Sequence, residues 1–400
     1  MDAPAILGFD PFDPAFRTDP YAHYRRFGPR LRRTEVGLWV TTSYEMCARV
    51  LRDPRFGHRP EGAGGFWSGQ NRRRSFLTLD PPDHTRLRRL VSKAFTARLV
   101  ERLRPRVEEV VGTLLADVRG EVDVISALAY PLPVIMISEL LGVPAGDRAR
   151  FKTWSDALAR GLDPDFLLSE DEIARRDEAR AEFVAYFTDL AEMRRKEPRD
   201  DLLSALVAVS DGDGGTDGDR LTEEELLATC VLLLVAGHET TVNLIGNGAL
   251  ALLRHPGQLA WFREYPEQVP AAVEELLRYD PPVQLTLRAA LEDVELDGAK
   301  LERGALVLLL TGAANRDPAV FAEPDRLDLS RYAAGPDEAS RHLAFGLGIH
   351  FCLGAPLARL EGQIALGRLF ERDVEPIGGD LGYRDNLVLR GLDTLPVRVS

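Results

Sequence analysis

The feature that most constrains this chain is a helical pattern of apolar residues over 223–254, about 48 Å long at ~1.5 Å per residue. Thr222 and Glu225 form a T-x-x-E capping pattern at its start, in which each side chain accepts from the other residue's backbone N–H. Pro256 ends the pattern, because proline cannot continue a helix. From 226 to 235 nearly every face is apolar, so the sequence predicts a long helix buried in a domain.

The middle of this helix, residues 236–241, carries a glycine and several polar side chains. Gly237 costs about 1 kcal/mol relative to alanine, and Glu239 and Thr240 lose water on burial unless they find partners. A loss of stability at the centre of a helix indicates a bound ligand or a local distortion there. The alternative is that these polar residues are solvated or covered by another loop. A zinc-protease motif is excluded, because Val242 stands where the second histidine should be.

A second motif, HLAFGLGIHFCLGAPLARLE at 342–361, surrounds Cys352. Its glycines permit tight turns and a close approach to a flat object. Pro356 opens the next helical pattern, so Cys352 precedes a helix N-terminus, whose positive end favours a thiolate over a thiol. A lone cysteine is more often an inert core residue, which is our interpretation of the other two, but that leaves the glycines here unexplained. A dinucleotide-binding loop fits less well, because Phe351 stands where the third glycine belongs.

The rest of the chain predicts a mainly α fold with small β-sheets. Further helical patterns lie at 85–94, 100–119, 170–195, 271–279 and 356–371. Strand-like segments lie at 33–42, 294–296 and 305–310, with short pieces in 387–399. No repeat or long linker interrupts the pattern, so we expect one domain over residues 1–400.

Charge and composition narrow the function. The formal net charge is −13, which argues against nucleic acid as the main partner, because phosphate binding needs a basic face. Three cysteines cannot form a closed disulfide framework. The chain start shows no signal peptide, and the longest clean apolar run, 230–236, is far shorter than the roughly 20 residues of a membrane span. We therefore expect a cytoplasmic protein that does not bind membranes. The preference for arginine over lysine is typical of GC-rich, actinobacterial-type coding.

Four motifs together resemble the cytochrome P450 family. The run F-G-x-G-x-H-x-C-x-G at 345–354 is similar to the family's haem-binding signature, and A-G-x-E-T at 236–240 to its oxygen-binding helix motif. E-x-x-R at 275–278 and H-x-x-x-R at 84–88 match two further family motifs. The motifs occur in the family's order, and the resemblance covers residues 21–395.

The resemblance implies a cytochrome P450 fold with haem b between the long central helix and the cysteine loop. It implies that Cys352 is the iron ligand, whose thiolate pushes electron density toward the iron and favours O–O cleavage. Glu239 and Thr240 match the acid–alcohol pair that passes protons to the oxygen, which favours O2 over peroxide as the oxidant. The other implied haem contacts, including those to the propionates, are His84, Arg88, Ala236, Gly237, Arg288, Phe345, His350 and Gly354.

Two further sets of residues follow from the family's positions. A structural ion pair is implied for Glu275 and Arg278, joined by a basic residue of the later meander, for which Arg326 is the best match. The implied substrate pocket is mostly apolar, which suits a hydrophobic organic substrate. Its residues are Phe66, Trp67, Leu233, Val235, Val283, Leu285 and Leu389.

The implied activity is a monooxygenase that hydroxylates or epoxidises a bacterial secondary metabolite, such as a polyketide or macrolide, free or bound to a carrier protein. Electrons would come from a ferredoxin and its reductase. A basic docking face for an acidic ferredoxin is one interpretation, and an ordinary solvated face the other; its candidates are Arg86, Arg89, Lys93 and Arg359. Oxidative coupling, a haem protein without turnover and a helical scaffold that has lost haem remain alternatives.

Overall fold

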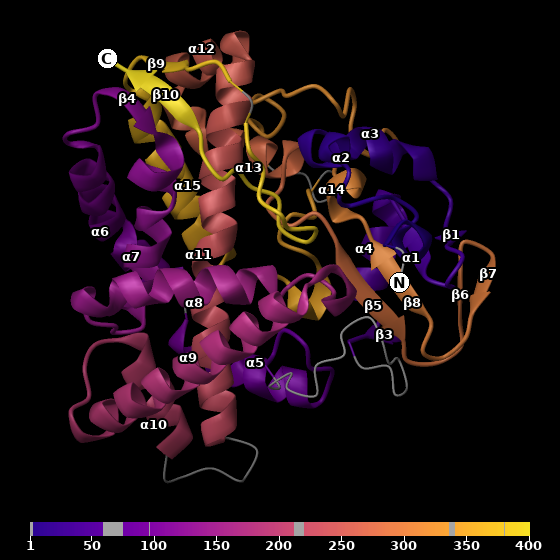
Figure 1. The fold of residues 1–400 in the computed structure, drawn as a ribbon, viewed down its shortest axis with the longest axis horizontal. Helices are drawn as coiled ribbons and strands as arrows, with labels where there is room; N and C mark the ends of the chain where they lie inside the picture. The colour runs from indigo at the N-terminus through magenta and orange to yellow at the C-terminus, as the bar shows by residue number, and fades with distance from the viewer. Residues whose placement is uncertain (1–2, 59–74, 96, 212–219, 336–340, 380) are drawn as a thin grey trace. The chain divides into compact units, whose positions relative to one another are not determined.

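Helices dominate this computed structural model, which describes residues 3–58, 75–95, 97–211, 220–335, 341–379 and 381–400. Contacts between its residues divide the chain into two compact units. The first unit comprises Met1–Gly62, Arg106–Leu132 and Thr240–Ser400, and the second Ala63–Pro105 and Pro133–Glu239. Three helices contribute residues to both units: α6 (Ala97–Leu115), α7 (Pro131–Leu140) and α11 (Glu223–Arg254). The elements are labelled in Figure 1.

The first unit contains a five-stranded sheet in the order β1-β2-β8-β5-β3. Its strands, in that order, are Arg32–Arg33, Trp39–Thr41, Leu306–Leu309, Thr286–Ala290 and Phe56–Gly57. All neighbours are antiparallel except β2 and β8, which run parallel with Trp39 opposite Val307. Strand β5 carries Arg288, which also lies opposite Val307.

Smaller sheets and helices complete the first unit. One sheet joins β4 (Gly120–Asp123), β10 (Pro396–Val399) and β9 (Val374–Pro376), and a hairpin joins β6 (Val294–Leu296) to β7 (Ala299–Leu301). Its longer helices are α4 (Tyr44–Arg52), α12 (Pro256–Glu264), α13 (Val269–Tyr279) and α15 (Ala355–Phe370), and α13 packs on α15.

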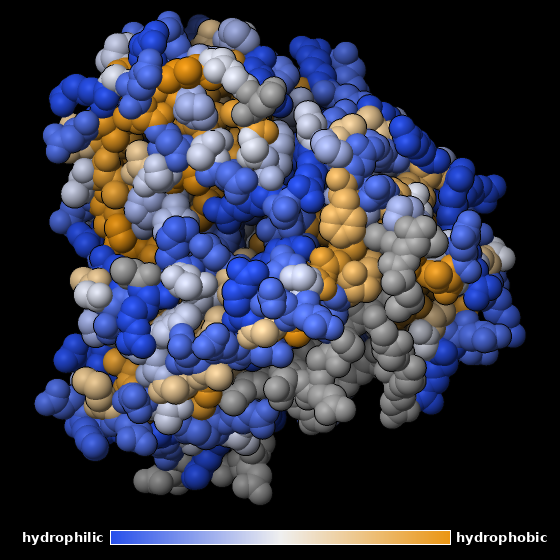
Figure 2. All heavy atoms as spheres, viewed as in Figure 1, coloured by the Kyte–Doolittle hydropathy of each residue, from blue (hydrophilic) through white to orange (hydrophobic). Residues whose placement is uncertain are grey.

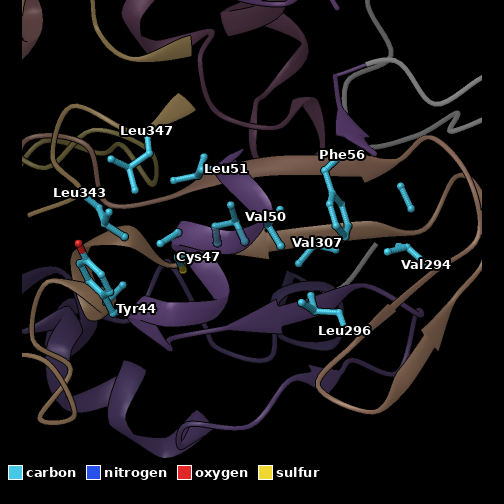
Figure 3. Packing of buried hydrophobic residues seen from close by; sticks show 14 of the residues in the cluster. Tyr44, Cys47, Val50, Leu51, Phe56, Val294, Leu296, Val307, Leu343 and Leu347 are labelled. Atoms are coloured by element: carbon cyan, nitrogen blue, oxygen red, sulfur yellow. The ribbon is translucent and has the colours of Figure 1, made fainter. Parts of the chain in front are cut away.

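A hydrophobic cluster attaches the cysteine loop to this unit (Figure 3). Leu343 and Leu347, which precede the cysteine, are buried with Cys47 and Leu51 of α4 and with Val307 of the sheet. These apolar contacts stabilise the position of the loop, because burial of each such side chain contributes about 1.5–3 kcal/mol.

The second unit is helical. It contains α5 (Asp83–Ala94), α8 (Arg148–Arg160), α9 (Glu170–Lys196) and α10 (Leu202–Asp211). A capping box between Ser169 and Glu172 begins α9. Helices α8 and α9 pack through aromatic side chains, with the ring of Phe151 5.2 Å from that of Phe183.

The long helix α11 confirms the sequence prediction at both ends. The Thr222 backbone N–H donates to Glu225 at 3.0 Å, and the Glu225 N–H donates to Thr222 Oγ1 at 3.2 Å. Of the helices described, α11 alone is long and apolar enough to span a membrane, but 67% of its most apolar window is buried inside the protein. It is therefore a core helix. On the face shown in Figure 2, polar residues cover most of the surface, with apolar patches between them.

The predicted strand at 33–42 is wrong in part, because it forms the two strands of a hairpin. Thr34 and Leu38 close the turn with a 2.8 Å backbone hydrogen bond, and Gly37 has a φ of +88°, which glycine adopts without strain. Only β10 forms a strand within 387–399; elsewhere in that segment, Leu389 and Leu392 make isolated bridges. Strand β5 and helix α8 were not predicted.

Candidate active site

The loop that carries Cys352 is held in shape by its own backbone. The Cys352 N–H donates to the Phe345 carbonyl at 3.0 Å, which closes the loop. Gly346 and Gly348 have φ values of +68° and +70°, where other residues are strained. A Cβ on Gly348 would lie 2.3 Å from the Leu51 carbonyl oxygen on α4, so only glycine lets the loop pack this closely on α4.

Cys352 differs from the other two cysteines in exposure. Cys47 and Cys230 are fully buried, and burial raises the pKa of the Cys230 thiol to about 12 and that of Cys47 further. The Cys352 thiol is half-buried, three residues before α15, whose N-cap is Gly354. A Cβ on Gly354 would lie 3.9 Å from the Cys352 sulfur. A small residue thus borders the least buried of the three cysteine sulfurs.

An ion-pair network anchors the start of this loop to α13. Glu274 accepts from Arg359 Nε and Nη2 at 2.6 and 2.7 Å and from His342 Nε2 at 3.1 Å. Burial would raise the pKa of Glu274, but these hydrogen bonds outweigh it and lower the pKa to about 2. The Arg359 guanidinium also lies 4.5 Å from the centroid of the Phe345 ring. The network therefore links α13, α15 and the cysteine loop.

The neighbouring carboxylate, Glu275, forms the buried ion pair expected from the E-x-x-R pattern. Arg278 Nε and Nη2 donate to Glu275 at 2.7 and 2.9 Å, and both side chains are fully buried. The prediction for Arg326 is wrong: its side chain pairs with Glu323 at the surface, and only its carbonyl accepts from Arg278. Arg331 is the joining residue, because its Nε donates to Glu275 at 3.1 Å.

The centre of α11 presents a strip of small residues. Ala236 is exposed and Gly237 and Thr240 are half-exposed, whereas the residues before and after the strip, 233–235 and 241–250, are buried. A Cβ on Gly237 would lie 3.1 Å from Ile137 of α7, so close helix packing also favours glycine here. The side chains of this strip are small, as contact with a flat group requires.

The polar residues beside this strip lie in a dry environment. His238 and Glu239 are each only 1% exposed, and Glu239 Oε1 lies 3.2 Å from His238 Nε2. The same nitrogen lies 2.8 Å from the hydroxyl of Ser155 on α8, which is fully buried. No sequence pattern pointed to Ser155, because helix α8 itself was not predicted.

The residues expected at the haem propionates are cationic or can donate hydrogen bonds. His84 and Arg88 lie one turn apart on α5, and burial, then the charge of Arg88, lower the pKa of His84. Arg288 is buried on β5, where its Nη1 donates to Thr286 and to the Leu287 carbonyl. His350 is half-buried, close to the ring of His58.

The residues expected to line a substrate pocket are described in part. Leu233 and Val235 are buried on α11, and Leu285 is buried beside Gln284. Val283 and Leu389 form an antiparallel bridge, so the structure brings these two together. Phe66 and Trp67 lie outside the described residues.

The four candidate docking residues differ in exposure and in their printed contacts. Arg86 pairs with Glu225 and Arg359 with Glu274, so carboxylates offset their charges. Arg89 and Lys93 are exposed on α5.

These residues fit a haem. Cys352 supplies a half-buried thiol on a glycine-rich loop, α11 supplies a strip without bulky side chains, and Arg288 supplies a buried cation suited to a propionate. The thiolate, when haem is bound, would supply electron density to the iron.

Comparisons with known proteins agree with this fit. The family model described as Cytochrome P450 matches residues 162–264 and 267–376. Cytochrome P450 monooxygenase PikC of Streptomyces venezuelae is 45% identical over 99% of this chain and 95% of its own. 6-deoxyerythronolide B hydroxylase of Saccharopolyspora erythraea is 41% identical over 95% of both chains. The crystal structure of P450BioI with an acyl carrier protein superposes with a TM-score of 0.86 at 39% identity, covering 96% of this chain and 100% of that one. The chain therefore belongs to the cytochrome P450 family of haem b monooxygenases.

Proposed function

We propose that the protein inserts one oxygen atom from O2 into a hydrophobic bacterial secondary metabolite of the polyketide or macrolide class, by hydroxylation or epoxidation. The observation that carries the proposal is the exposed strip on α11 followed by the Glu239 and Thr240 pair. Thr240 is half-exposed and can hold a hydrogen bond beside the reacting oxygen, while the adjacent carboxyl can supply protons.

The roles of the remaining residues follow from their chemistry. Cys352 is the iron ligand, and His84, Arg88, Arg288 and His350 hold the haem propionates, which need cationic or hydrogen-bonding partners inside a protein. Ala236, Gly237, Phe345 and Gly354 would line the haem. Glu275, Arg278 and Arg331 stabilise the fold around the cysteine loop and take no part in the chemistry.

The substrate class is supported by the apolar pocket residues and by two relatives. PikC is named a monooxygenase, and the Saccharopolyspora enzyme is named a hydroxylase of 6-deoxyerythronolide B. A screen of macrolactones and linear polyketides for a spin-state change of the ferric haem tests this. We expect a low-spin to high-spin shift with a macrolactone, and a shift confined to small aromatic compounds would contradict the proposal.

Turnover separates this activity from its alternatives. With O2 and a reduced electron donor, the compound that shifts the spin state should gain one oxygen atom. Thr240→Ala should release more peroxide and less product, because proton delivery is impaired. Formation of a dimer or ring without added oxygen would indicate oxidative coupling, and binding without any product would indicate a haem protein without turnover.

We also propose a ferredoxin as the electron donor, docking on the basic face of Arg86, Arg89, Lys93 and Arg359, of which Arg89 and Lys93 are the two exposed residues. Replacing both by glutamine should slow reduction by an acidic ferredoxin about tenfold at low salt, since steering depends on complementary charge. A control that removes the same charge elsewhere, Arg254→Gln with Lys300→Gln, should change the rate less than twofold. Equal rates for both double variants would contradict this docking site.

The second candidate is a carrier-linked form of the substrate, which is favoured by the P450BioI complex with a loaded acyl carrier protein. The same compound offered free and on a carrier protein distinguishes the two forms by its dissociation constant.

A cytoplasmic location follows from the proposed use of a ferredoxin, and cell fractionation would check it.

A further inference from the structure

We propose that a cavity between the N-terminal helices and the C-terminal segment binds a small anion, of the size of a halide ion or a carboxylate group. One wall of the cavity comes from α2 (Pro14–Thr18) and α3 (Pro20–Tyr24), and another from residues 383–391. All of these residues belong to the first unit. The proposed function does not use this cavity, and the anion site does not depend on it.

The charge of the cavity lining is positive. Arg17, Arg384 and Arg390 line it, and neither aspartate nor glutamate is among the described residues that do so. Asp385 pairs with Arg17, and Asp280 pairs with Arg390, so carboxylates outside the lining offset part of this charge. In a chain with a formal net charge of −13, a lining whose charged residues are all arginines favours an anion over a cation.

Arg390 is the buried cation of this site, because it is only 9% exposed. Its Nε donates to Asp280 at 2.8 Å. Its Nη1 donates to the Arg17 carbonyl at 2.5 Å, and its Nη2 donates to the Thr18 carbonyl at 3.1 Å. A guanidinium carries five N–H bonds, and the described residues accept from three of them. The other two can donate to an anion, and charge-assisted hydrogen bonds of this kind are strong.

Two tyrosine hydroxyls of the lining, those of Tyr24 and Tyr383, have no hydrogen-bond partner among the described residues. Tyr24 is 1% exposed, and a buried hydroxyl without a partner is costly, so we expect a bound group beside it. The Arg390 guanidinium lies 4.1 Å from the centroid of the Tyr383 ring. Burial raises the pKa of Tyr24, and the charge of Arg390 opposes only part of that rise. The Tyr24 hydroxyl is therefore a proton donor at neutral pH.

The size of the cavity limits the ligand. About 20 Å³ of it is open to the centre of a water molecule, and one water needs about 10–15 Å³ on the same measure. The cavity thus has room for one or two small atoms or for a single carboxylate group. We infer that the ligand is a halide, formate or the carboxylate group of a longer acid, and that a whole metabolite is too large.

The simpler alternative is that the cavity holds only water. Gln284 also lines the cavity, and its Oε1, which can only accept, has no partner among the described residues. Water can donate to this oxygen and an anion cannot. A Cβ on Gly312 would lie 2.5 Å from the oxygen, so it lies against backbone that is not part of the lining. The arginines and the two tyrosine donors favour an anion in the rest of the cavity.

An anion at this place would link the N-terminal helices to the C-terminal segment and to the core. The Arg390 backbone N–H donates to the Pro282 carbonyl at 2.8 Å, and the Arg390 carbonyl accepts from Asn247 of α11 at 3.0 Å. The Arg390 side chain reaches the carbonyls before α3, as described above. A ligand that binds only the folded protein stabilises it, so the anion should raise the unfolding midpoint.

The experiment measures the thermal unfolding midpoint of the haem-loaded enzyme while sodium chloride or sodium formate replaces the sodium salt of a bulky sulfonate at constant ionic strength. Tyr24→Phe and Tyr383→Phe each remove one hydroxyl from the cavity and little volume. Tyr265→Phe, which removes a hydroxyl from an exposed residue outside the cavity, is the matched control. The Soret absorption is followed in parallel, because an anion that binds the haem iron would change it.

We expect the midpoint to rise saturably, by about 2 °C at about 200 mM anion if the dissociation constant is roughly 10 mM. Tyr24→Phe and Tyr383→Phe should each weaken binding about tenfold, because a hydrogen bond to a charged group is lost. Tyr265→Phe should behave as wild type, and the Soret band should not change. Hexanoate in place of formate distinguishes two sources of the carboxylate, since tighter binding indicates the end of a longer acid and weaker binding a free ion.

An equal rise in wild type and in both cavity variants would place the anion elsewhere and overturn the proposal. The absence of a saturable rise with either anion would show that the cavity holds only water. A rise that follows a change of the Soret band would assign the effect to the haem iron and overturn the proposal as well. If one cavity variant does not fold, the other carries the test. None of these results bears on the proposed oxygen insertion, whose tests use a substrate.

Discussion

At the scale of single residues, two adjacent glutamates on α13 serve different parts of the structure. Glu275 is fully buried with Arg278 and receives Arg331 from the meander, whereas Glu274 binds Arg359 and His342 beside the cysteine loop. Adjacent helical residues point about 100° apart, which is why one helix can brace two segments. A sequence motif that names only Glu275 and Arg278 describes half of this arrangement.

Acid stability tests the role of Glu274. Its pKa is lowered from 4.5 to about 2 in the folded protein, so its charged form stabilises the fold by about 3 kcal/mol. Because the folded pKa is the lower one, this stabilisation is complete above pH 4.5 and is lost as the pH falls toward 2. Glu274→Gln should therefore lower the free energy of unfolding at pH 7, and the difference from wild type should shrink below pH 4.5. Urea unfolding across this range measures it, and a constant difference would contradict the account.

The meander arginines provide a matched pair. Arg331→Ala removes a donor to the buried Glu275 carboxylate and should cost about 1–3 kcal/mol of stability. Arg326→Ala removes only a surface pair with Glu323 and should change stability by less than about 0.5 kcal/mol. Unfolding in urea at pH 7 distinguishes them, and the reverse order would support the sequence-based assignment to Arg326 over the structural one.

At the scale of elements, the cysteine loop is a rigid turn packed on α4. Its closure depends on a backbone bond to Phe345, on two glycines with positive φ and on apolar residues that precede it. Rigidity of this kind holds a coordinating side chain within about 0.5 Å of its working position, whether or not its partner is bound.

The two glycines make a matched test of that packing. Gly348→Ala places a methyl group against the Leu51 carbonyl, which is backbone and cannot rotate away, and adds strain at positive φ. Gly346→Ala adds the strain of about 1–2 kcal/mol alone, because its nearest neighbour is 4.0 Å away. Haem retention during gel filtration and the unfolding midpoint should fall more for Gly348→Ala. Equal losses would show that packing on α4 does not matter.

At the scale of the whole molecule, local signals explain what the sequence could predict. The bounds of α11 were predictable because its cap, its apolar pattern and Pro256 are all local. The hairpin within 33–42 was missed because β-branched and apolar residues stand on both sides of its turn. Arg331 was missed because two arginines of one meander differ only in tertiary position, and the contact of His238 with Ser155 joins residues 83 positions apart. Residues that belong to a local sequence motif could be named from the sequence. Contacts that depend on how distant segments pack could not.

The central proposal is that the Cys352 sulfur would hold the haem iron. The absorption spectrum of the reduced, CO-bound protein tests it most directly, in wild type and in Cys352→Ala, with Cys230→Ala as the control. The account predicts a strongly red-shifted thiolate-type band in wild type and in Cys230→Ala, and its loss in Cys352→Ala. A red-shifted band that survives in Cys352→Ala, or its absence from haem-loaded wild type, would contradict the claim.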